Sequence, residues 1–120
     1  MRMMKPRRGE VWRVELGPTR GDEMRKTRPA VVVSDDQVGK LNLCIVVPVT
    51  DWKDRYAQAP WMIRLNPDAG NGLVNPSAAD AFQVRSVSHE RLQARMGSLP
   101  QATVDTLAEA IALCVGYRGH

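Results

Sequence analysis

The apolar residues of this chain occur in short runs separated by turn-forming residues, and this pattern limits the fold more than any other feature. Residues 10–16, EVWRVEL, alternate apolar and polar side chains, which is typical of a half-buried strand. Residues 30–34, AVVVS, and 43–49, LCIVVPV, are apolar enough for strands that are covered on both faces. Because Pro48 cannot donate a hydrogen bond to a ladder, we expect it at a sheet edge or a bulge.

Three later segments extend the strand pattern. We predict strands at residues 61–65, WMIRL, around residues 81–87, AFQVRSV, and at residues 94–99, ARMGSL. Between the last two, Ser88 can cap a single helical turn. Residues 66–77, NPDAGNGLVNPS, have the composition of turns, and their Asn-Gly pair is the strongest turn signal in the segment.

Residues 17–29, GPTRGDEMRKTRP, are rich in glycine, proline and charge and predict one long mobile loop. Loops above about 12 residues in a compact domain are usually functional or disordered. The C-terminal region gives the clearest helix signal, because Pro100 suits a first-turn position and Gly116 lies near the expected end. The predicted apolar face of this helix recurs at helical spacing and consists of Val104, Leu107, Ala108, Ile111, Ala112 and Val115.

Several short strands, a short helix and a terminal helix predict a mainly β fold, a small β-barrel with an amphipathic C-terminal helix. With 120 residues, of which 43% are hydrophobic, the chain fits a single domain over residues 1–120, and we expect residues 1–7 to be flexible. No apolar run reaches the roughly 20 residues that span a bilayer, so we expect no membrane partner. The basic start lacks the apolar stretch of a secretory signal, which favours a cytoplasmic location.

The formal net charge of +4 and the isoelectric point near 9.5 suit a polyanionic partner. The cations form three clusters: Arg2, Lys5, Arg7 and Arg8; Arg20, Arg25, Lys26 and Arg28; and Lys53 with Arg55. Trp52 and Tyr56 are interleaved with the third cluster, as in surfaces where aromatic rings stack on unpaired bases while cations hold phosphates. Each cluster alone also fits an ordinary solvated surface. The combination favours single-stranded nucleic acid.

The cysteines and histidines predict neither a disulfide nor a metal cofactor. Cys44 and Cys114 both lie inside apolar runs, where a reduced thiol behaves as a small buried hydrophobic group. The only histidines are His89 and His120, and the chain has no Cys-x-x-Cys pair. We therefore expect no metal and no other cofactor.

The motifs, taken in order, resemble those of the MazF/PemK/Kid family of toxin–antitoxin ribonucleases. They are RGEVWRVELGPTRGDE, RPAVVVS, VVPVT, then GL with a downstream serine, and finally Q.R.V, and the match runs from about Arg8 to Tyr117. The resemblance implies an SH3-like β-barrel and a homodimer. It also implies metal-independent, sequence-specific cleavage of single-stranded RNA in a groove across the dimer. A small cognate antitoxin, MazE-like and with an acidic tail, is the implied protein partner.

Three residues match catalytic positions of this family. Arg28 matches the arginine of the RP motif, where a guanidinium can hold phosphate oxygens and stabilise a doubly charged phosphorane. Thr50 matches the catalytic threonine, whose hydroxyl can donate to a phosphate oxygen or position the 2′-OH. Glu23 matches the loop glutamate, which either orients Arg28, accepts a proton or simply balances neighbouring cations.

Further positions are candidates for RNA binding. Gln83 matches a family glutamine, Arg85 follows on the same strand face, and Ser77 matches a polar position at the preceding turn. Plain strand polarity is the alternative for these three. His89 lies outside the motifs and is best explained as a surface or capping histidine. The complete RNA-binding set is Lys26, Trp52, Lys53, Tyr56, Ser77, Gln83 and Arg85.

The chain also departs from the family pattern. Many relatives have an aspartate directly before the glutamine and an arginine two residues further back, where this chain has Phe82 and Asp80. The acid–base roles given to that pair do not transfer, so the general acid and base stay unassigned. Residues 24–27, MRKT, make the first loop more basic than is usual, and Asp51 replaces a small hydroxyl residue. A catalytically decayed RNA-binding module, a gyrase-poisoning toxin of the same fold and a plain protein-interaction surface are the alternatives.

Overall fold

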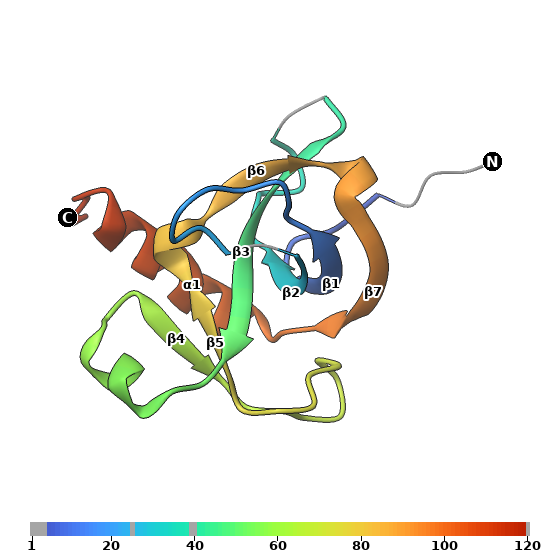
Figure 1. The fold of residues 1–120 in the computed structure, drawn as a ribbon. Helices are drawn as coiled ribbons and strands as arrows, with labels where there is room; N and C mark the ends of the chain where they lie inside the picture. Colours follow the sequence, from blue (N-terminus) through green and yellow to red (C-terminus); the bar gives the residue numbers. More distant parts are fainter. Residues whose placement is uncertain (1–4, 25, 39–40, 120) are drawn as a thin grey trace.

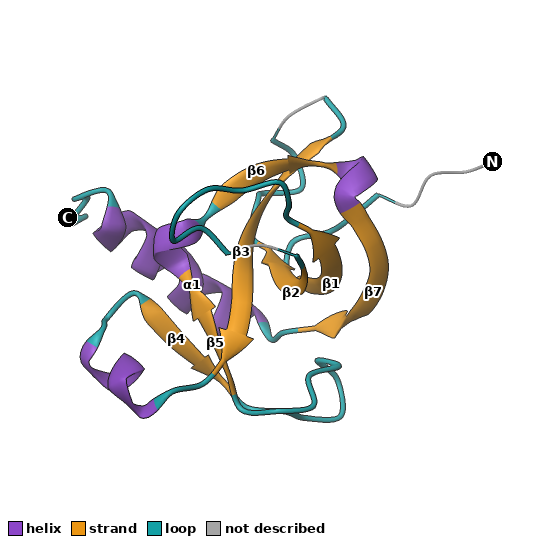
Figure 2. Cartoon of the chain, viewed as in Figure 1, coloured by secondary structure: helices purple, strands orange, loops and turns teal. Residues whose placement is uncertain are grey.

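The computed structural model describes residues 5–24, 26–38 and 41–119, which form a single twisted sheet with one α-helix against it (Figure 1). Three short 3-10 turns, η1 to η3, interrupt the connections between strands (Figure 2). The elements, in order, are β1 (Glu10–Glu15), β2 (Thr27–Val32), β3 (Leu43–Asp51), η1 (Asp54–Gln58), β4 (Met62–Leu65), β5 (Ser77–Asp80), η2 (Ala81–Gln83), β6 (Arg85–Ser88), η3 (His89–Arg91), β7 (Leu92–Ser98) and α1 (Gln101–Cys114).

The strands pair in the order β4-β5-β3-β2-β1-β7, and β6 pairs with β3 beside β5. All of these pairings are antiparallel. The prediction of a mainly β fold with a C-terminal helix is confirmed. The term barrel applies only loosely, because β4 and β7 stand at the two ends of the order and no pairing among the described strands joins them.

β3 is the central strand, and it changes partner halfway along one side. Its first part, Leu43–Val46, pairs with β6, and its last part, Val49–Asp51, pairs with β5. Pro48 lies at this change of partner and stands opposite Ala30 of β2 on the other side. Of the two positions predicted for Pro48, a sheet edge or a bulge, the edge is wrong. The proline is tolerated inside the sheet because the ladder on one side is already interrupted there.

Two apolar clusters lie on opposite faces of the sheet, since successive residues of a strand point to opposite sides. The cluster under α1 contains Val11, Val31, Val47, Val49, Leu65, Leu73, Ala79, Leu99, Val104 and Leu107. The second cluster contains Trp12, Val14, Leu16, Ala30, Val32, Cys44, Val46 and Val87. Both faces of β2 and of the middle of β3 are thus covered, as predicted. The start of β3 is an exception, because Leu43 and Ile45 are exposed.

The predicted C-terminal helix is confirmed, with Pro100 directly before its first residue. Val104, Leu107 and Ala110 are its buried residues, and Ile111 packs partly against the first cluster. The predicted face is wrong at two positions: Ala108 is exposed, and Val115 follows the last helical residue with 75% of its surface exposed.

Three predicted boundaries need correction. β2 begins at Thr27, so Arg28 belongs to a strand and not to the preceding loop. Ser77–Asp80 is a strand, although its sequence SAAD has no β-branched residue and its pairing and burial come from tertiary context. Ala81–Gln83 is a 3-10 turn where a strand was predicted. The turn follows from Asp80, whose Oδ1 accepts a hydrogen bond of 3.0 Å from the Phe82 N–H.

Other expectations have mixed outcomes. The turn capped by Ser88 is confirmed, since its Oγ accepts from the Glu90 N–H. Cys44 and Cys114 are not joined by a disulfide. Residues 1–4 lie outside the described residues, and the flexibility of residues 1–7 stays a prediction. Within the described part of the chain, no helix is long and apolar enough to cross a bilayer.

Candidate active site

A groove of about 560 Å³ lies on the sheet face that carries the second cluster. Three segments line it: Asp22, Glu23 and Met24 of the Gly17–Lys26 loop between β1 and β2, in which Arg25 is outside the described residues; the middle of β3; and the chain from η2 into β6. In Figure 1 this loop, drawn in blue, arches across β3. The lining residues are Leu16, Asp22, Glu23, Met24, Pro48, Phe82, Gln83, Val84 and Arg85. Three of the predicted site residues, Glu23, Gln83 and Arg85, are therefore brought together.

Strand register relates Arg28 and Thr50 to this groove, although neither residue lines it. Ala30 stands opposite Pro48, and the same antiparallel register, continued for two residues, would set Arg28 opposite Thr50. Residues two apart on a strand share a face, which is here the face of Pro48, a groove-lining residue. Both residues are half-buried. We therefore expect the two predicted catalytic side chains on the sheet face of the groove, and their catalytic role stays a prediction.

Gln83 connects the groove wall to the Gly17–Lys26 loop. Its Oε1 accepts a hydrogen bond of 2.6 Å from the Met24 N–H. Its Nε2 donates to the Asp22 carbonyl at 3.4 Å and to Asp80 Oδ2 at 3.2 Å. The amide that sequence reasoning assigned to RNA is thus used within the protein in this state.

Two arginines hold the beginning of the same loop. Arg85 Nη1 donates to the Leu16 carbonyl at 3.1 Å, and Arg91 Nη1 donates to the Gly17 carbonyl at 2.6 Å. A guanidinium has five N–H donors, so one bond to a carbonyl leaves Arg85 with donors for a second acceptor such as a phosphate oxygen. Sequence reasoning missed Arg91, which is the last residue of the capped turn η3 and carries no motif signal.

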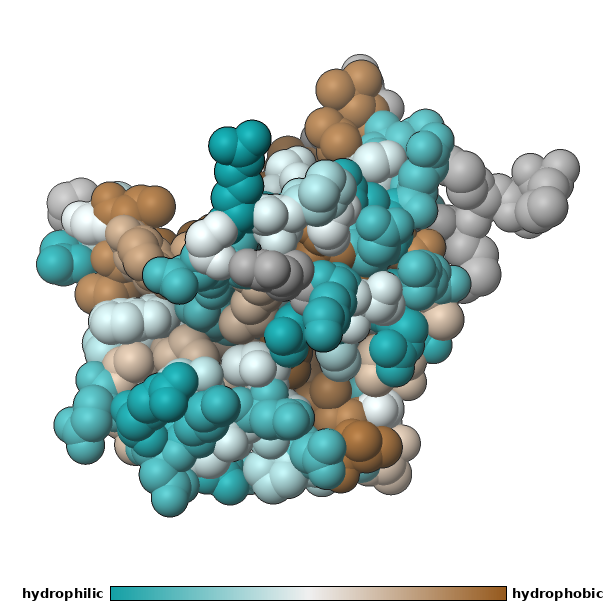
Figure 3. Space-filling view, viewed as in Figure 1, coloured by the Kyte–Doolittle hydropathy of each residue, from teal (hydrophilic) through white to brown (hydrophobic). Residues whose placement is uncertain are grey.

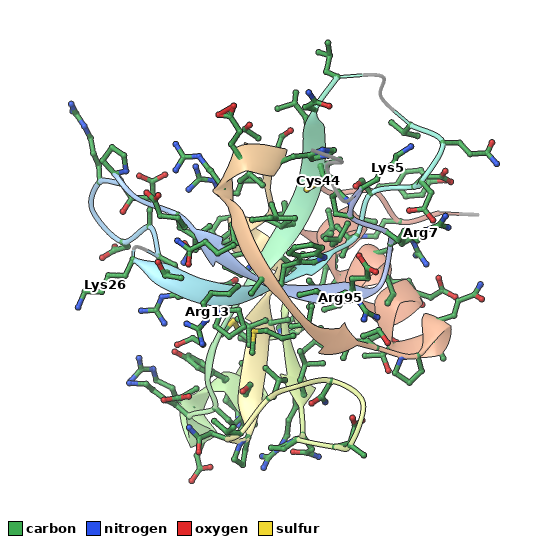
Figure 4. The ribbon with its side chains drawn as sticks, turned by 90° about the vertical axis from the view of Figure 1, so that its right-hand side faces the viewer. Lys5, Arg7, Arg13, Lys26, Cys44 and Arg95 are labelled. Atoms are coloured by element: carbon green, nitrogen blue, oxygen red, sulfur yellow. The ribbon has the colours of Figure 1, made fainter. Side chains whose placement is uncertain are left out.

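Glu23 closes a turn inside the loop. Its Oε1 accepts from the Arg20 N–H at 2.6 Å, and its own N–H donates to the Arg20 carbonyl at 3.2 Å. This contact favours the reading of Glu23 as a loop carboxylate, and its role as a proton acceptor stays a prediction. Lys26, at the end of the loop, is exposed and has a φ of 69°, the only positive φ among the described non-glycine residues. Figure 4 shows its side chain directed away from the sheet.

The Asp51–Pro60 loop, which follows Thr50, carries an aromatic pair with cations over its rings. Trp52 and Tyr56 meet edge to face with centroids 5.9 Å apart. The guanidinium of Arg55 lies 5.3 Å from the Tyr56 centroid, and that of Arg64 lies 4.8 Å from the Trp52 centroid. Sequence reasoning missed Arg64, because it sits on β4 and reaches Trp52 only through the fold.

Lys53 and Ser77 differ in accessibility. Lys53 is exposed at the start of the Asp51–Pro60 loop. Ser77 is only 5% exposed, and its hydroxyl donates to the Asn75 carbonyl at 2.7 Å. In this state the Ser77 hydroxyl serves the turn before β5, and its contact with RNA stays a prediction. Figure 3 shows hydrophilic side chains over much of the face that carries the Gly17–Lys26 loop.

Asp80, which bonds to groove-lining residues, and Cys44, which lies in the second cluster, have raised pKa values. Burial raises the pKa of the Asp80 carboxyl, although hydrogen bonds from Phe82 and Gln83 act in the opposite direction. Burial also raises the pKa of the Cys44 thiol to about 11, which keeps it protonated and unsuited to nucleophilic attack. Phe82, which replaces the family aspartate, is 69% exposed and lines the groove. Within the described residues, no three side chains of the metal-binding types come together.

Comparisons with known proteins identify the family of the chain and its fold. Residues 7–115 match the family model described as PemK-like, MazF-like toxin of type II toxin–antitoxin system. The endoribonuclease MazF9 of Mycobacterium tuberculosis is 38% identical over 114 residues, which cover 89% of this chain and 93% of that protein. MazF from Deinococcus radiodurans has a similar structure, with a TM-score of 0.79 at 23% identity, covering 94% of this chain and 98% of the other.

A mycobacterial endoribonuclease, solved in complex with its cognate antitoxin, also has this fold, with a TM-score of 0.73 at 20% identity over 96% of this chain and 99% of its own. At such identities the structural likeness attests the fold alone. The family model and MazF9 extend over nearly the whole sequence, and they confirm the resemblance found in the motifs. The chain belongs to the PemK-like, MazF-like toxins of type II toxin–antitoxin systems.

Proposed function

We propose that this chain is a toxin that cleaves single-stranded RNA as a sequence-specific endoribonuclease, without a metal ion. The observation that supports the proposal is the pairing of Ala30 with Pro48, because the same register continued for two residues would bring Arg28 opposite Thr50 on the sheet face of the groove. Membership of the toxin family and the names of its curated relatives, which are endoribonucleases, support it.

The proposed reaction uses the substrate's own 2′-OH as the nucleophile. Its oxygen forms a bond to the adjacent phosphorus, and the bond from phosphorus to the 5′-oxygen of the next nucleotide breaks. The 2′-OH gives up its proton, the leaving 5′-oxygen gains one, and the products are a 2′,3′-cyclic phosphate and a 5′-OH. Arg28 stabilises the charge that develops on the phosphorane oxygens, because a guanidinium stays ionised and offers paired donors. Thr50 donates its hydroxyl to the same phosphate.

The groove and the two loops that follow β1 and β3 supply the proposed RNA contacts. Lys26, Lys53 and Arg85 hold backbone phosphates, and Trp52 and Tyr56 stack on unpaired bases. Arg64 lies over one face of Trp52, so a base must use the other ring face or displace the guanidinium. Gln83 contacts RNA once its bond to Met24 is exchanged for one to a base edge or phosphate.

The proposed partners follow from the family and from the net charge of +4 of the chain. A cognate, MazE-like antitoxin covers the groove and nearby exposed cations with an acidic segment and so blocks RNA. One relative of the same fold is known in complex with its antitoxin. We also propose a homodimer, with the groove completed across the dimer, acting in the cytoplasm where RNA and antitoxin are present.

A non-catalytic RNA-binding module is the second candidate. Phe82 favours it, because an exposed apolar ring lines the groove where the family carries a carboxylate. Such a protein would keep the cations and aromatic rings of the groove and lose the chemistry.

One experiment separates the two candidates. The protein is purified in EDTA and incubated with a long unstructured RNA, and the fragment ends are mapped for the wild type, Arg28→Ala and Arg13→Ala. Arg13 is the matched control: it is an exposed arginine on the neighbouring strand, paired with Pro29 and therefore directed to the other face. Discrete cuts with cyclic phosphate ends that persist in Arg13→Ala and vanish in Arg28→Ala support the ribonuclease. Intact RNA that is bound by the wild type contradicts it and supports the binding module.

A further inference from the structure

The groove contains a chain of hydrogen bonds that ends at a carboxylate with no counterpart in the family pattern. The Met24 N–H donates to Gln83 Oε1, and Gln83 Nε2 donates to Asp80 Oδ2. Asp80 is only 8% exposed, and its other oxygen, Oδ1, accepts from the Phe82 N–H. The loop between β1 and β2 is thus connected through one side chain to a nearly buried acid on β5.

Asp80 determines which end of the Gln83 amide donates and which end accepts in this series of hydrogen bonds. A primary amide has donors at one end and an acceptor at the other, whereas an ionised carboxylate only accepts. Facing the carboxylate, Gln83 must present its NH₂ group to Asp80. Its oxygen is then left facing the loop, where it can accept from the Met24 N–H. With a donor in place of Asp80 Oδ2, the Gln83 NH₂ group faces another donor and keeps only its longer bond of 3.4 Å to the Asp22 carbonyl, so the orientation that accepts from the Met24 N–H is less strongly fixed.

We propose that Asp80 is a positioning residue that, by fixing the orientation of the Gln83 amide, holds the Gly17–Lys26 loop closed over the groove. The docking of the loop does not depend on what the groove binds. Its consequence for the reaction rests on the proposed function: RNA must break or exchange the bond between Met24 and Gln83, so the stability of the closed loop opposes RNA entry.

A simpler role for Asp80 is that of a cap for the 3-10 turn of Ala81–Gln83. The two roles make different demands on the side chain. The cap needs one acceptor for the Phe82 N–H, which asparagine supplies with its Oδ1. The orientation of Gln83 needs a second acceptor, and asparagine has a donor there. Asp80→Asn therefore retains the cap and removes the positioning.

The test follows hydrogen exchange of single backbone amides by NMR in the full chain without RNA. In Asp80→Asn, exchange of the Met24 amide should rise by about tenfold, the loss of one hydrogen bond. The Phe82 amide should stay protected. The double variant Asp80→Asn with Gln83→Glu should restore protection of Met24, because asparagine then donates to a carboxylate whose other oxygen accepts from the loop. Asp68→Asn, which makes the same charge change at a residue that accepts from Gly70 and Asn71, should leave Met24 unchanged.

Two results would overturn the proposal. One is an unchanged Met24 amide in Asp80→Asn. The other is a joint loss of amide protection at Met24, Phe82 and the core residue Val31 that persists in the double variant. That result would show that Asp80 has a purely structural role. Cleavage assays on the same proteins keep this question apart from the proposed function. Absence of cleavage in the wild type would contradict the ribonuclease while leaving the exchange result for the loop intact.

Discussion

The two loops beside the groove are held in different ways. The Gly17–Lys26 loop is fastened through its backbone, by side chains that reach it from η2, β6 and η3. The Asp51–Pro60 loop is organised by its own rings, Trp52 against Tyr56, with a guanidinium over each. Directional hydrogen bonds can be exchanged for bonds to a ligand, whereas packed rings keep their arrangement. We therefore expect the first loop to move when RNA binds, and the second loop to offer rings that are already in place for stacking.

We expect the largest effect on RNA cleavage from a substitution at Arg28, in the strand between the two loops. Arg28→Lys keeps the positive charge but loses the paired donors of the guanidinium, so we expect cleavage to fall by about 10²–10³-fold. RNA affinity should change little, since both loops keep their contacts. Single-turnover cleavage and equilibrium binding, measured on the same RNA, check this. Equal losses in rate and in affinity would mean that Arg28 only holds RNA, as the loops do.

Trp52 tests the stacking surface. Trp52→Ala should weaken RNA binding by about 1–3 kcal/mol, the usual contribution of one stacked base. Exchange of the Met24 amide should be unaffected, because the first loop is fastened independently. Titration of a fluorescent RNA gives the affinity, and Tyr56→Phe, which keeps its ring, serves as the control. If Met24 exchange rose in Trp52→Ala, the two loops would be coupled and the distinction between them would fail.

We expect the smallest effect on the pH dependence of the free energy of unfolding, because hydrogen bonds to Asp80 partly offset the effect of burial on its pKa. Its pKa in the folded protein is raised above 3.8, so the folded state binds this proton more tightly than the unfolded chain. Its contribution to the free energy of unfolding is therefore present at low pH and is lost as pH rises through the raised pKa. In urea unfolding across this range, the wild type should lose stability relative to Asp80→Asn as the pH rises. Matching slopes would contradict the assignment of the raised pKa to Asp80.

Much of the fold could be predicted from local patterns. The continuous apolar runs of β2 and β3 indicated cover on both faces, and two clusters provide it. Ser77–Asp80 could not be predicted as a strand, because small and polar residues carry no strand signal and its pairing with β3 and β4 is a property of the whole sheet. Pro48 correctly indicated an interrupted ladder, but the sequence did not show that the interruption lies in the central strand β3.

Some features of the candidate site could also be predicted from the sequence, and others could not. The family motifs identified Arg28 and Thr50, and the register of β2 with β3, continued for two residues, would set them opposite each other. The partners of Gln83 could not be predicted, since Met24 and Asp22 lie about sixty positions away in the chain. Asp80 was noticed only as a departure from the family pattern. Its chemistry depends on burial and on the orientation of one amide, and neither is written in a local stretch of sequence.

The position of β1 between β2 and β7 has a consequence for synthesis on the ribosome. A nascent chain that has emerged only as far as Asp51 already carries Arg28 and Thr50, but η2 and β6, which wall the groove, are still to come. β1 gains its second neighbour only when β7 is made, close to the C-terminus. Pairings so distant in sequence form late. A fragment that stops before η2 and β6 therefore lacks part of the groove wall, and we expect it not to cleave RNA.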